Sequence, residues 1–273
     1  MFYEGSEKRL EITTTLNLLE FDDTFWDEMV NQAGAYVISK IENDRLKSFL
    51  LSESSLFVWK NRLLLITCGE THLLQASLFF QKKVARNKIT SLLFQRHHPH
   101  LPEKQKSSFQ QDSLLLQKQL RGDSHHWSEN YCGSIFLFGN NQQCLATKNI
   151  LMLHELSGVF FDQLNKGKVL APEVAKQLQL AEYFNHFMID QFSFEPKGYS
   201  LNAIKNEYYF TLHITPEKQT SYVSFESNLP EAEIQVFHQH LSTLFKPKRA
   251  YLMSFTPSEE RLLIDTQTVK SGN

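Results

Sequence analysis

Three short apolar runs follow one another almost without connecting chain, and this spacing constrains the fold more than any other feature of the sequence. They occupy residues 46–51, 55–59 and 62–68, and only Lys60 and Asn61 separate the last two. Runs of this length joined by two residues are typical of β-hairpins. Residues 71–85 then carry apolar side chains at helical spacing. The pattern predicts strands of a sheet that lead into a helix.

The same signals recur along the rest of the chain. Asp22, Asp23 and Thr24 form a cap signal for a helix through residues 26–30. β-branched and aromatic runs predict further strands at residues 8–15, 35–41, 133–138, 190–195, 206–215 and 220–226, with a helix near 230–244. Strands lead into a helix in both halves, which is compatible with an internal duplication, although no residue-level repeat establishes it.

Residues 95–130 differ from their surroundings because they are polar and rich in glutamine, and they predict a surface excursion with a helix at 109–120. No linker rich in proline, glycine or serine separates the two halves, so we expect one domain over residues 1–273. Leu151 begins the second half. After Tyr251 the chain soon ends at Asn273, which leads us to expect one sheet to lack an edge strand.

Composition limits the partners. The chain has 28 Lys and Arg against 30 Asp and Glu, so no strong field attracts nucleic acid or an anionic membrane. No run is long and apolar enough to cross a bilayer, and the first residues lack a signal-peptide pattern. Three cysteines at wide spacing favour a reducing cytoplasm. The histidines at 97, 98, 100, 125 and 126 lie in the polar segment, and we predict no metal site there.

Six short motifs occur in a fixed order. They are Tyr3-Glu4-Gly5-Ser6-Glu7-Lys8, Leu51-Ser52-Glu53-Ser54-Ser55-Leu56-Phe57-Val58, Thr67-Cys68-Gly69, Gly198-Tyr199-Ser200-Leu201-Asn202, His213-Ile214-Thr215-Pro216-Glu217 and Ser221-Tyr222-Val223-Ser224-Phe225-Glu226. In this order the chain resembles the eukaryotic-type S-adenosylmethionine decarboxylases, pyruvoyl enzymes of polyamine biosynthesis. The resemblance implies an α+β fold, a four-layer α/β/β/α sandwich of two antiparallel sheets flanked by helices.

The resemblance implies that the chain cuts itself. The Ser54 hydroxyl attacks the carbonyl of Glu53, the amide becomes an ester, and β-elimination leaves a pyruvoyl group. The products are residues 1–53, the small β chain, and residues 54–273, the large α chain, which stay associated. His213 is implied as the base that removes the Cα proton of the serine, and Ser200 as the residue that steadies the cyclic intermediate.

The resemblance also implies the reaction that follows. The pyruvoyl carbonyl forms a Schiff base with S-adenosylmethionine and draws electrons from the bond to the carboxylate, without pyridoxal phosphate or a metal. Cys68 then supplies a proton, since a thiol titrates close to working pH. Decarboxylated S-adenosylmethionine is the aminopropyl donor for spermidine and spermine.

Substrate contacts follow from the same resemblance. The rings of Tyr3 and Phe194 stack on the adenine, and Glu217 holds the ribose hydroxyls. Further positions implied at the site are the backbones of Leu51 and Glu53 at the adenine edge, and the catalytic-site acids Glu4 and Glu7.

The acidic cluster at which many relatives bind the activator putrescine is incomplete here. Leu145 and Asn149 stand where two of its acids are expected, and Ile66 where a lysine is common; Glu7 and Glu226 remain. A diamine dication needs facing carboxylates to offset its desolvation, so we expect little or no putrescine activation.

Two other functions stay open. One is a pyruvoyl decarboxylase of a free amino acid such as ornithine or arginine, for which Phe194 and Glu217 would have no use. The other is a catalytically silent regulatory paralogue, and the intact residues Ser54, Cys68, Ser200 and His213 argue against it.

Overall fold

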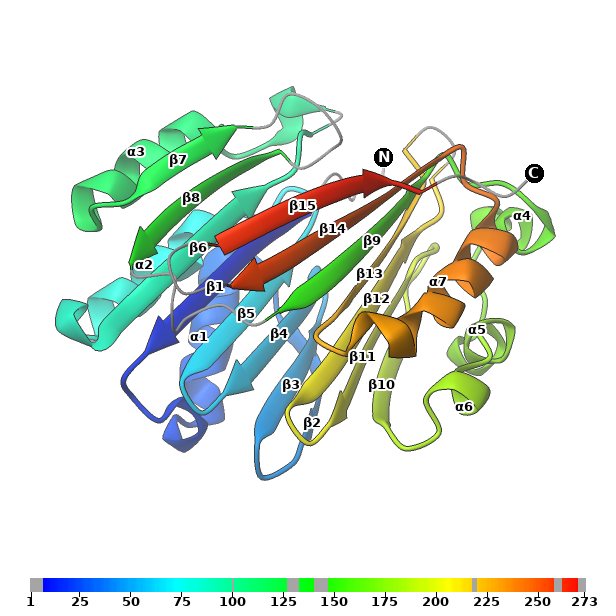
Figure 1. The fold of residues 1–273 in the computed structure, drawn as a ribbon, viewed down its shortest axis with the longest axis horizontal. Helices are drawn as coiled ribbons and strands as arrows, with labels where there is room; N and C mark the ends of the chain where they lie inside the picture. The colour runs from blue at the N-terminus through cyan, green and yellow to red at the C-terminus, as the bar shows by residue number, and fades with distance from the viewer. Residues whose placement is uncertain are drawn as a thin grey trace. The chain divides into compact units, whose positions relative to one another are not determined.

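A computed structural model describes residues 7–99, 101–126, 133–139, 147–217, 220–257 and 262–269. The chain forms two compact units. The first comprises Met1–Leu145 with Pro257–Leu263, and the second comprises Ala146–Thr256 with Ile264–Asn273. Each unit is built on one large antiparallel sheet (Figure 1).

The sheet of the first unit has the strand order β2-β3-β4-β5-β1-β6-β8-β7. Its central meander confirms the hairpin predicted from the apolar runs, because the chain turns at Lys60 and Asn61 between β4 and β5. The described elements of this unit are β1 (Lys8–Thr14), η1 (Leu18–Glu20), α1 (Asp23–Ala33), β2 (Val37–Glu42), β3 (Leu46–Leu51), β4 (Ser54–Trp59), β5 (Arg62–Thr67), α2 (Leu73–Lys83), η2 (Arg86–Lys88), β6 (Ile89–Arg96), η3 (Pro102–Lys104), α3 (Phe109–Gln119), β7 (Asp123–His126) and β8 (Ser134–Gly139).

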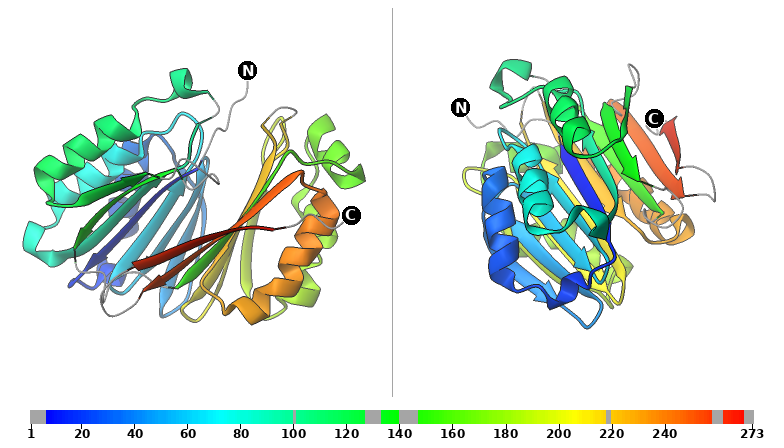
Figure 2. Two further views of the ribbon diagram at one scale, coloured as in Figure 1. Left: turned by 45° about the horizontal axis from the view of Figure 1, so that its top comes forward. Right: turned by 90° about the vertical axis from the view of Figure 1, so that its left-hand side faces the viewer.

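Helices α1 and α2 cover one face of this sheet (Figure 2). Trp26 and Val30 of α1 and Phe80 of α2 pack with Leu56 and Val58 of β4 in one hydrophobic core. The predicted cap is confirmed, since the Asp22 carboxylate accepts a hydrogen bond from the Phe25 N–H. The helical layer therefore holds the central strands rigidly, and with them the turn between β3 and β4.

The sheet of the second unit has the order β10-β11-β12-β13-β9-β14-β15. The side chains of Phe210, Leu212 and Ile214 point into one core with Phe237 and Leu241 of α7, as the alternation of that strand predicts. The described elements are β9 (Lys148–His154), α4 (Val159–Lys166), α5 (Ala171–Gln177), α6 (Leu180–Tyr183), β10 (Met188–Ser193), β11 (Tyr199–Lys205), β12 (Tyr208–Thr215), β13 (Tyr222–Ser227), α7 (Glu231–Phe245), β14 (Arg249–Pro257) and β15 (Leu262–Thr268).

The two units share one topology. In each, the first strand lies between the fifth and sixth strands, helices follow the first strand, and a four-stranded meander leads into a second helix. This correspondence supports the interpretation of an internal duplication. The units differ between β6 and β8, where residues 97–133 carry η3, α3 and β7, whereas only residues 258–261 separate β14 from β15. We call residues 97–133 the insertion.

The structure confirms an α+β fold with two large antiparallel sheets and helices on both units. The expectation of a surface excursion over residues 95–130 is wrong in part. Gln95 and Arg96 are buried because they end β6 beside β1, and the buried His97 donates its N–H to the Glu7 carbonyl. Asp123–His126 forms an edge strand. The predicted helix at 109–120 is confirmed as α3, which a Ser108 capping box begins.

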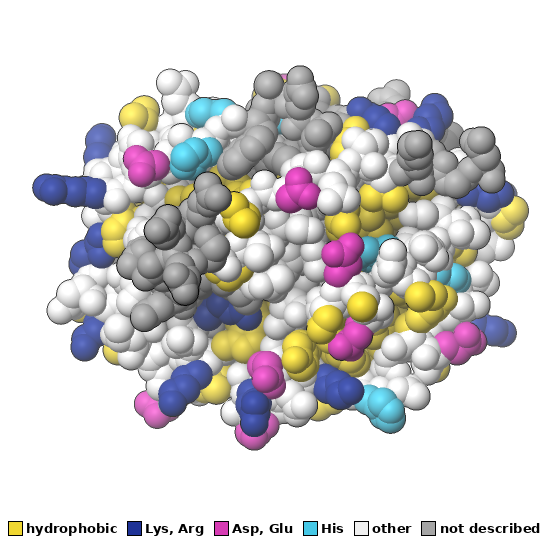
Figure 3. Space-filling model, viewed as in Figure 1, with side chains coloured by type: hydrophobic (Ala, Val, Ile, Leu, Met, Phe, Trp, Pro, Cys, Tyr) yellow, Lys and Arg dark blue, Asp and Glu magenta, His cyan; other side chains and the backbone are white. Residues whose placement is uncertain are grey.

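Side chains of both signs are scattered over the face of the molecule drawn in Figure 3, in keeping with the net charge of −2. Over the described ranges, no helix is long and apolar enough to span a membrane.

Candidate active site

The turn between β3 and β4 carries the bond predicted to break. Leu51 pairs with Ser54 across the hairpin, so only Ser52 and Glu53 form the turn. Ser54 has φ 134°, a backbone conformation that glycine adopts and other residues avoid. Strain of this kind costs on the order of 1–3 kcal/mol and persists only where the surrounding structure imposes it. Here β5 imposes it, since Ser54 is held opposite Thr67 in the ladder.

The carbonyl of Glu53, which precedes the strained residue, is held by Cys68. The backbone N–H of Cys68 donates to the Glu53 oxygen at 3.1 Å, and the Cys68 thiol lies 3.4 Å from the same oxygen. Two donors on one carbonyl polarise it toward attack at carbon. The thiol also lies 3.8 Å from Glu53 Oε2. Burial raises the pKa of the Glu53 carboxyl, and the hydrogen bond from Cys68 opposes that rise.

Lys8 anchors the loop that follows Cys68. Its Nζ donates to the carbonyl oxygens of Gly69 and Thr71, both at 2.8 Å, and the Thr71 hydroxyl donates to the Cys68 carbonyl at 2.7 Å. Burial, with a smaller effect of the Arg96 charge, lowers the pKa of Lys8 to about 8. Sequence reasoning did not identify Lys8 as a site residue, although Lys8 closes the first of the six motifs and begins a predicted strand.

Ser200 and His213 face one another in the second unit. They are paired across β11 and β12, and Ser200 Oγ lies 2.9 Å from His213 Nδ1. The other ring nitrogen, Nε2, lies 2.9 Å from the Thr211 hydroxyl. That hydroxyl has its single proton within reach of the backbone carbonyl oxygen of Leu201 and of the side-chain oxygen Oδ1 of Asn202, at 3.0 Å each.

This network selects a tautomer of His213. When the Thr211 proton goes to a carbonyl oxygen, the Thr211 lone pairs accept Nε2–H, and Nδ1 is left unprotonated. Nδ1 then accepts from Ser200 and is the ring atom able to take up a proton. Thr211 and His213 alternate with Phe210 and Leu212 in the sequence, which places both on one face of the strand, but the sequence does not reveal the role of Thr211 toward His213.

The residues expected to bind substrate fall in several places. Phe194 follows β10, with its ring 5.0 Å from that of Phe192, and its N–H donates to the Gly198 carbonyl, in the turn that leads to Ser200. Glu217 follows β12 and accepts a hydrogen bond from Thr220. Leu51 ends β3 with a buried side chain. Tyr3 and Glu4 lie outside the described residues.

The acid at position 7 is not a free carboxylate. Glu7 forms a buried ion pair with Arg9, whose Nη1 lies 2.8 Å from His97 Nε2. Ile66 stands between Arg9 and Ser55 in the ladder of the first sheet.

A lysine that sequence reasoning missed accompanies Glu226. Lys148 is almost fully buried on β9, with its Nζ 4.0 Å from Glu226 Oε1 and 4.9 Å from the centre of the Phe255 ring. Tyr209 donates to the same carboxylate oxygen at 2.7 Å. Asn149 accepts from the Ser254 hydroxyl at 2.7 Å, and Leu145 lies outside the described residues.

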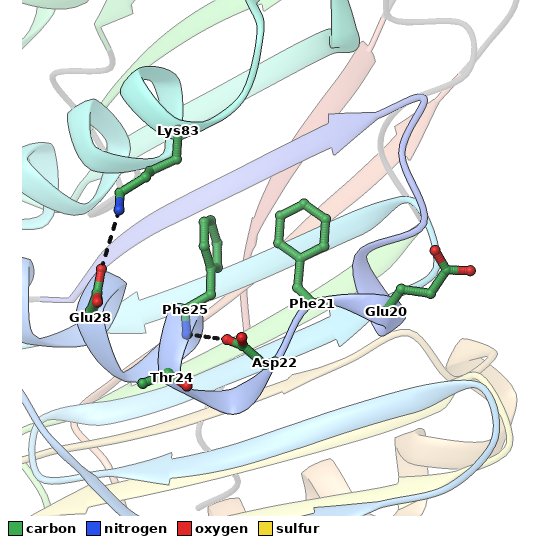
Figure 4. Close-up of a pocket in the computed structure, with 7 residues that line it drawn as sticks. All are labelled: Glu20, Phe21, Asp22, Thr24, Phe25, Glu28 and Lys83. Atoms are coloured by element: carbon green, nitrogen blue, oxygen red, sulfur yellow. Dashed lines mark hydrogen bonds and ion pairs between the residues drawn. The ribbon is translucent and has the colours of Figure 1, made fainter.

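No cluster of three or more His, Cys, Asp or Glu side chains with metal-binding geometry occurs in the described ranges. A hollow of about 400 Å³ lies between the start of α1 and the end of α2 (Figure 4). Its acids already have partners, because Asp22 caps α1, Glu28 pairs with Lys83 at 3.5 Å and Glu20 accepts from Asn17. None of the predicted site residues lines it.

The structure thus brings Glu53, Ser54 and Cys68 together in the first unit, and Ser200, Thr211 and His213 together in the second. The model of one protein family, described as adenosylmethionine decarboxylase, matches residues 1–271. The chain belongs to this family. The S-adenosylmethionine decarboxylase family consists of carboxy-lyases, as the sequence motifs imply.

Relatives agree with this assignment. The S-adenosylmethionine decarboxylase proenzyme of Dictyostelium discoideum is 30% identical over 90% of this chain and 73% of its own length. The proenzyme of Leishmania donovani is 28% identical over 94% of this chain and 74% of its own length. The crystal structure of the Trypanosoma brucei AdoMetDC-delta26 monomer matches with a TM-score of 0.58 and 22% identity, over 73% of this chain and 79% of that one. The structural match supports the fold.

Proposed function

We propose that this chain cleaves itself between Glu53 and Ser54 and uses the resulting pyruvoyl group to decarboxylate S-adenosylmethionine for spermidine and spermine synthesis. The observation that carries the proposal is the turn itself. Among the described residues of the site, Ser54 is the only non-glycine residue with a positive φ. Cys68 donates a hydrogen bond to the carbonyl of the residue before it, Glu53. Strain and polarisation therefore meet at the bond that must break.

The processing steps follow from the residues present. Ser54 Oγ attacks the Glu53 carbonyl carbon, the bond from that carbon to the Ser54 nitrogen breaks, and an ester links the two residues. Loss of the Ser54 Cα proton then expels the Glu53 carboxylate, and water replaces the nitrogen to leave a ketone and ammonia. We propose that His213 Nδ1 removes the Cα proton and that the Ser200 hydroxyl stabilises the first intermediate. The 2.9 Å contact between the two side chains supports this assignment.

The pyruvoyl group, once formed, supplies an electron sink for decarboxylation. The residues fit it, since position 54 is buried and lies beside the only described cysteine, Cys68. We assign to the Cys68 thiol the delivery of a proton to the substrate carbon after CO2 leaves. We propose that the rings of Phe194 and Tyr3 stack on the adenine and that Glu217 holds the ribose hydroxyls. Supporting roles at the site are proposed for Leu51, Glu4 and Glu7.

The two fragments are proposed to stay associated because cleavage leaves them interlaced in one sheet. Residues 1–53 supply β1, β2 and β3, whereas residues 54–273 supply β4, β5 and β6. β1 lies between β5 and β6, and β3 pairs with β4. Separation would break three ladders and expose the core beneath them.

We further propose that putrescine has little or no effect. Glu226 already has a buried cation, Lys148, and a hydrogen bond from Tyr209. Asn149 and Ile66 offer no carboxylate to a diamine. A buried diamine dication in addition to Lys148 would therefore lack compensating charge. The few cysteines at wide spacing support a cytoplasmic location.

The test compares Ser54→Ala with Ser52→Ala. Ser52 stands two residues earlier, and its hydroxyl accepts from the Tyr36 N–H at 3.2 Å, so its loss removes a similar group from the same turn. Ser54→Ala should remain one chain and release no CO2 from carboxyl-labelled S-adenosylmethionine. Ser52→Ala should give two fragments and retain activity. Fragments together with CO2 release from Ser54→Ala would show that the mechanism is wrong.

A further inference from the structure

The insertion, residues 97–133, contacts the loop that carries Cys68. Gln105 Nε2 donates to the Gly69 carbonyl at 3.2 Å, directly after Cys68 in the chain. The same carbonyl accepts from Lys8 at 2.8 Å. Gly69 has φ 63°, so the loop turns sharply at the residue that receives both bonds.

Buried charges fix the orientation of the Gln105 amide. Arg96 Nη2 donates to Gln105 Oε1 at 3.1 Å, which directs the amide NH2 toward Gly69. Arg96 Nη1 in turn donates to Asp112 Oδ2 at 2.6 Å and to the Ser107 hydroxyl at 3.1 Å. Arg96 and Asp112 are buried, so the pair is rigid. A chain of bonds therefore runs from α3 through Gln105 to the loop.

The second unit offers an internal comparison. Its sheet repeats the order of the first, but β14 and β15 are separated by residues 258–261 alone. The described part of the insertion is thus extra structure on a duplicated plan, and its Gln105 reaches the Cys68 loop.

We propose that Gln105 is a positioning residue that, through Gly69, fixes where the Cys68 thiol delivers its proton. The proposal rests on the role of Cys68 as proton donor given above. Gln105 acts on the loop and not on the substrate, so its loss should change the destination of the proton more than the binding of substrate.

The destination of that proton has two chemical outcomes. When the bond to the carboxylate breaks, CO2 leaves and the electron pair left behind takes one proton from the thiol. A proton on the substrate carbon gives, after hydrolysis, the amine product and the intact pyruvoyl group. A proton on the carbon of the cofactor gives, after hydrolysis by the same single water, an aldehyde and an alanine at the N-terminus of residues 54–273.

The experiment measures this partition in cleaved protein. Wild type, Gln105→Ala, Gln105→Glu and Gln117→Ala are turned over with S-adenosylmethionine, and the N-terminal peptide of the large fragment is weighed for pyruvoyl against alanyl ends. Gln105→Glu keeps an acceptor for Arg96 but has no proton to donate to Gly69. Gln117 lies exposed on α3 and serves as the matched control.

Loss of one neutral hydrogen bond predicts roughly a two- to tenfold rise in alanyl ends per turnover in both Gln105 variants. Gln117→Ala should match wild type. A second measurement uses the uncleaved Ser54→Ala background, in which Gln105→Glu should change the rate at which iodoacetamide alkylates Cys68.

The outcomes separate the two proposals. If Cys68→Ser raises alanyl ends and the Gln105 variants do not, the inference about Gln105 is overturned while the role of Cys68 stands. If Cys68→Ser leaves the partition unchanged, Cys68 is not the donor and both fall. The inference is supported if Gln105→Glu gives more alanyl ends than wild type while its thermal unfolding midpoint shows that it is folded.

Discussion

Thr211→Val removes the hydroxyl that selects the tautomer of His213 and leaves the shape of the side chain almost unchanged. In the structure this hydroxyl lies 2.9 Å from Nε2 and is oriented by the Leu201 backbone carbonyl and by Asn202 Oδ1. Valine cannot accept Nε2–H, so the ring loses its preference for the form with unprotonated Nδ1. We therefore expect the step that expels the ester carboxylate to slow.

The magnitude follows from one buried hydrogen bond, which has a net worth of about 1 kcal/mol. Since about 1.4 kcal/mol corresponds to a tenfold change, the ratio of the reactive tautomer to the other one should fall roughly fivefold. Ester elimination in Thr211→Val should then be slower than in wild type by up to roughly fivefold. Thr211→Ser keeps the hydroxyl and is the matched control.

The assay follows fragment formation over time in freshly expressed protein. Hydroxylamine cleaves the Glu53 ester and not the amide, so the ester is measured as the fraction of chain that hydroxylamine splits. Thr211→Val should accumulate this fraction, and Thr211→Ser should not. Equal ester levels in the two variants would refute the reasoning about the tautomer.

Three further predictions concern single residues. His213→Ala should stall at the ester, slowed by about 10²- to 10⁴-fold as expected for loss of a general base, and hydroxylamine should split it. Putrescine dose–response curves should be flat in wild type but rise in Lys148→Ala, where Glu226 loses its cation; a clear rise in wild type would sink this idea. Burial lowers the pKa of Lys8 from 10.5 to about 8, so between these values the unfolded chain binds more protons than the folded protein, and stability rises with pH. Relative to Lys8→Met, the unfolding free energy of wild type should gain about 2 kcal/mol from about pH 7.5 to about pH 9.5, measured by urea titration.

The hairpin around Lys60 was predictable because local spacing alone sets a two-residue turn. The buried face of β12 was predictable for a similar reason, since Phe210, Leu212 and Ile214 alternate with polar residues. In both cases neighbours in the sequence determine the outcome.

Strand β11 was not predicted, because the polar Ser200 and Asn202 interrupt its apolar residues. Both are buried, and partners on β12 satisfy them. Arg96 was assigned to the surface for a related reason, as charged residues are mostly exposed. Its partner Asp112 belongs to α3, and no local pattern in the sequence reports that pairing.

The candidate site was predictable where a motif carried it, as for Glu53, Ser54 and Cys68, which do lie together. The residues that orient them were not. Lys8, Thr211 and Gln105 act through contacts between strands or across the insertion, and such contacts depend on the folded register.

The central claim is that Ser54 becomes the cofactor of its own chain, and the intact mass of freshly purified protein tests it most directly. The account predicts two fragments that split between Glu53 and Ser54, the larger one blocked at its N-terminus by a pyruvoyl group. A single uncleaved chain that nevertheless decarboxylates S-adenosylmethionine would contradict it.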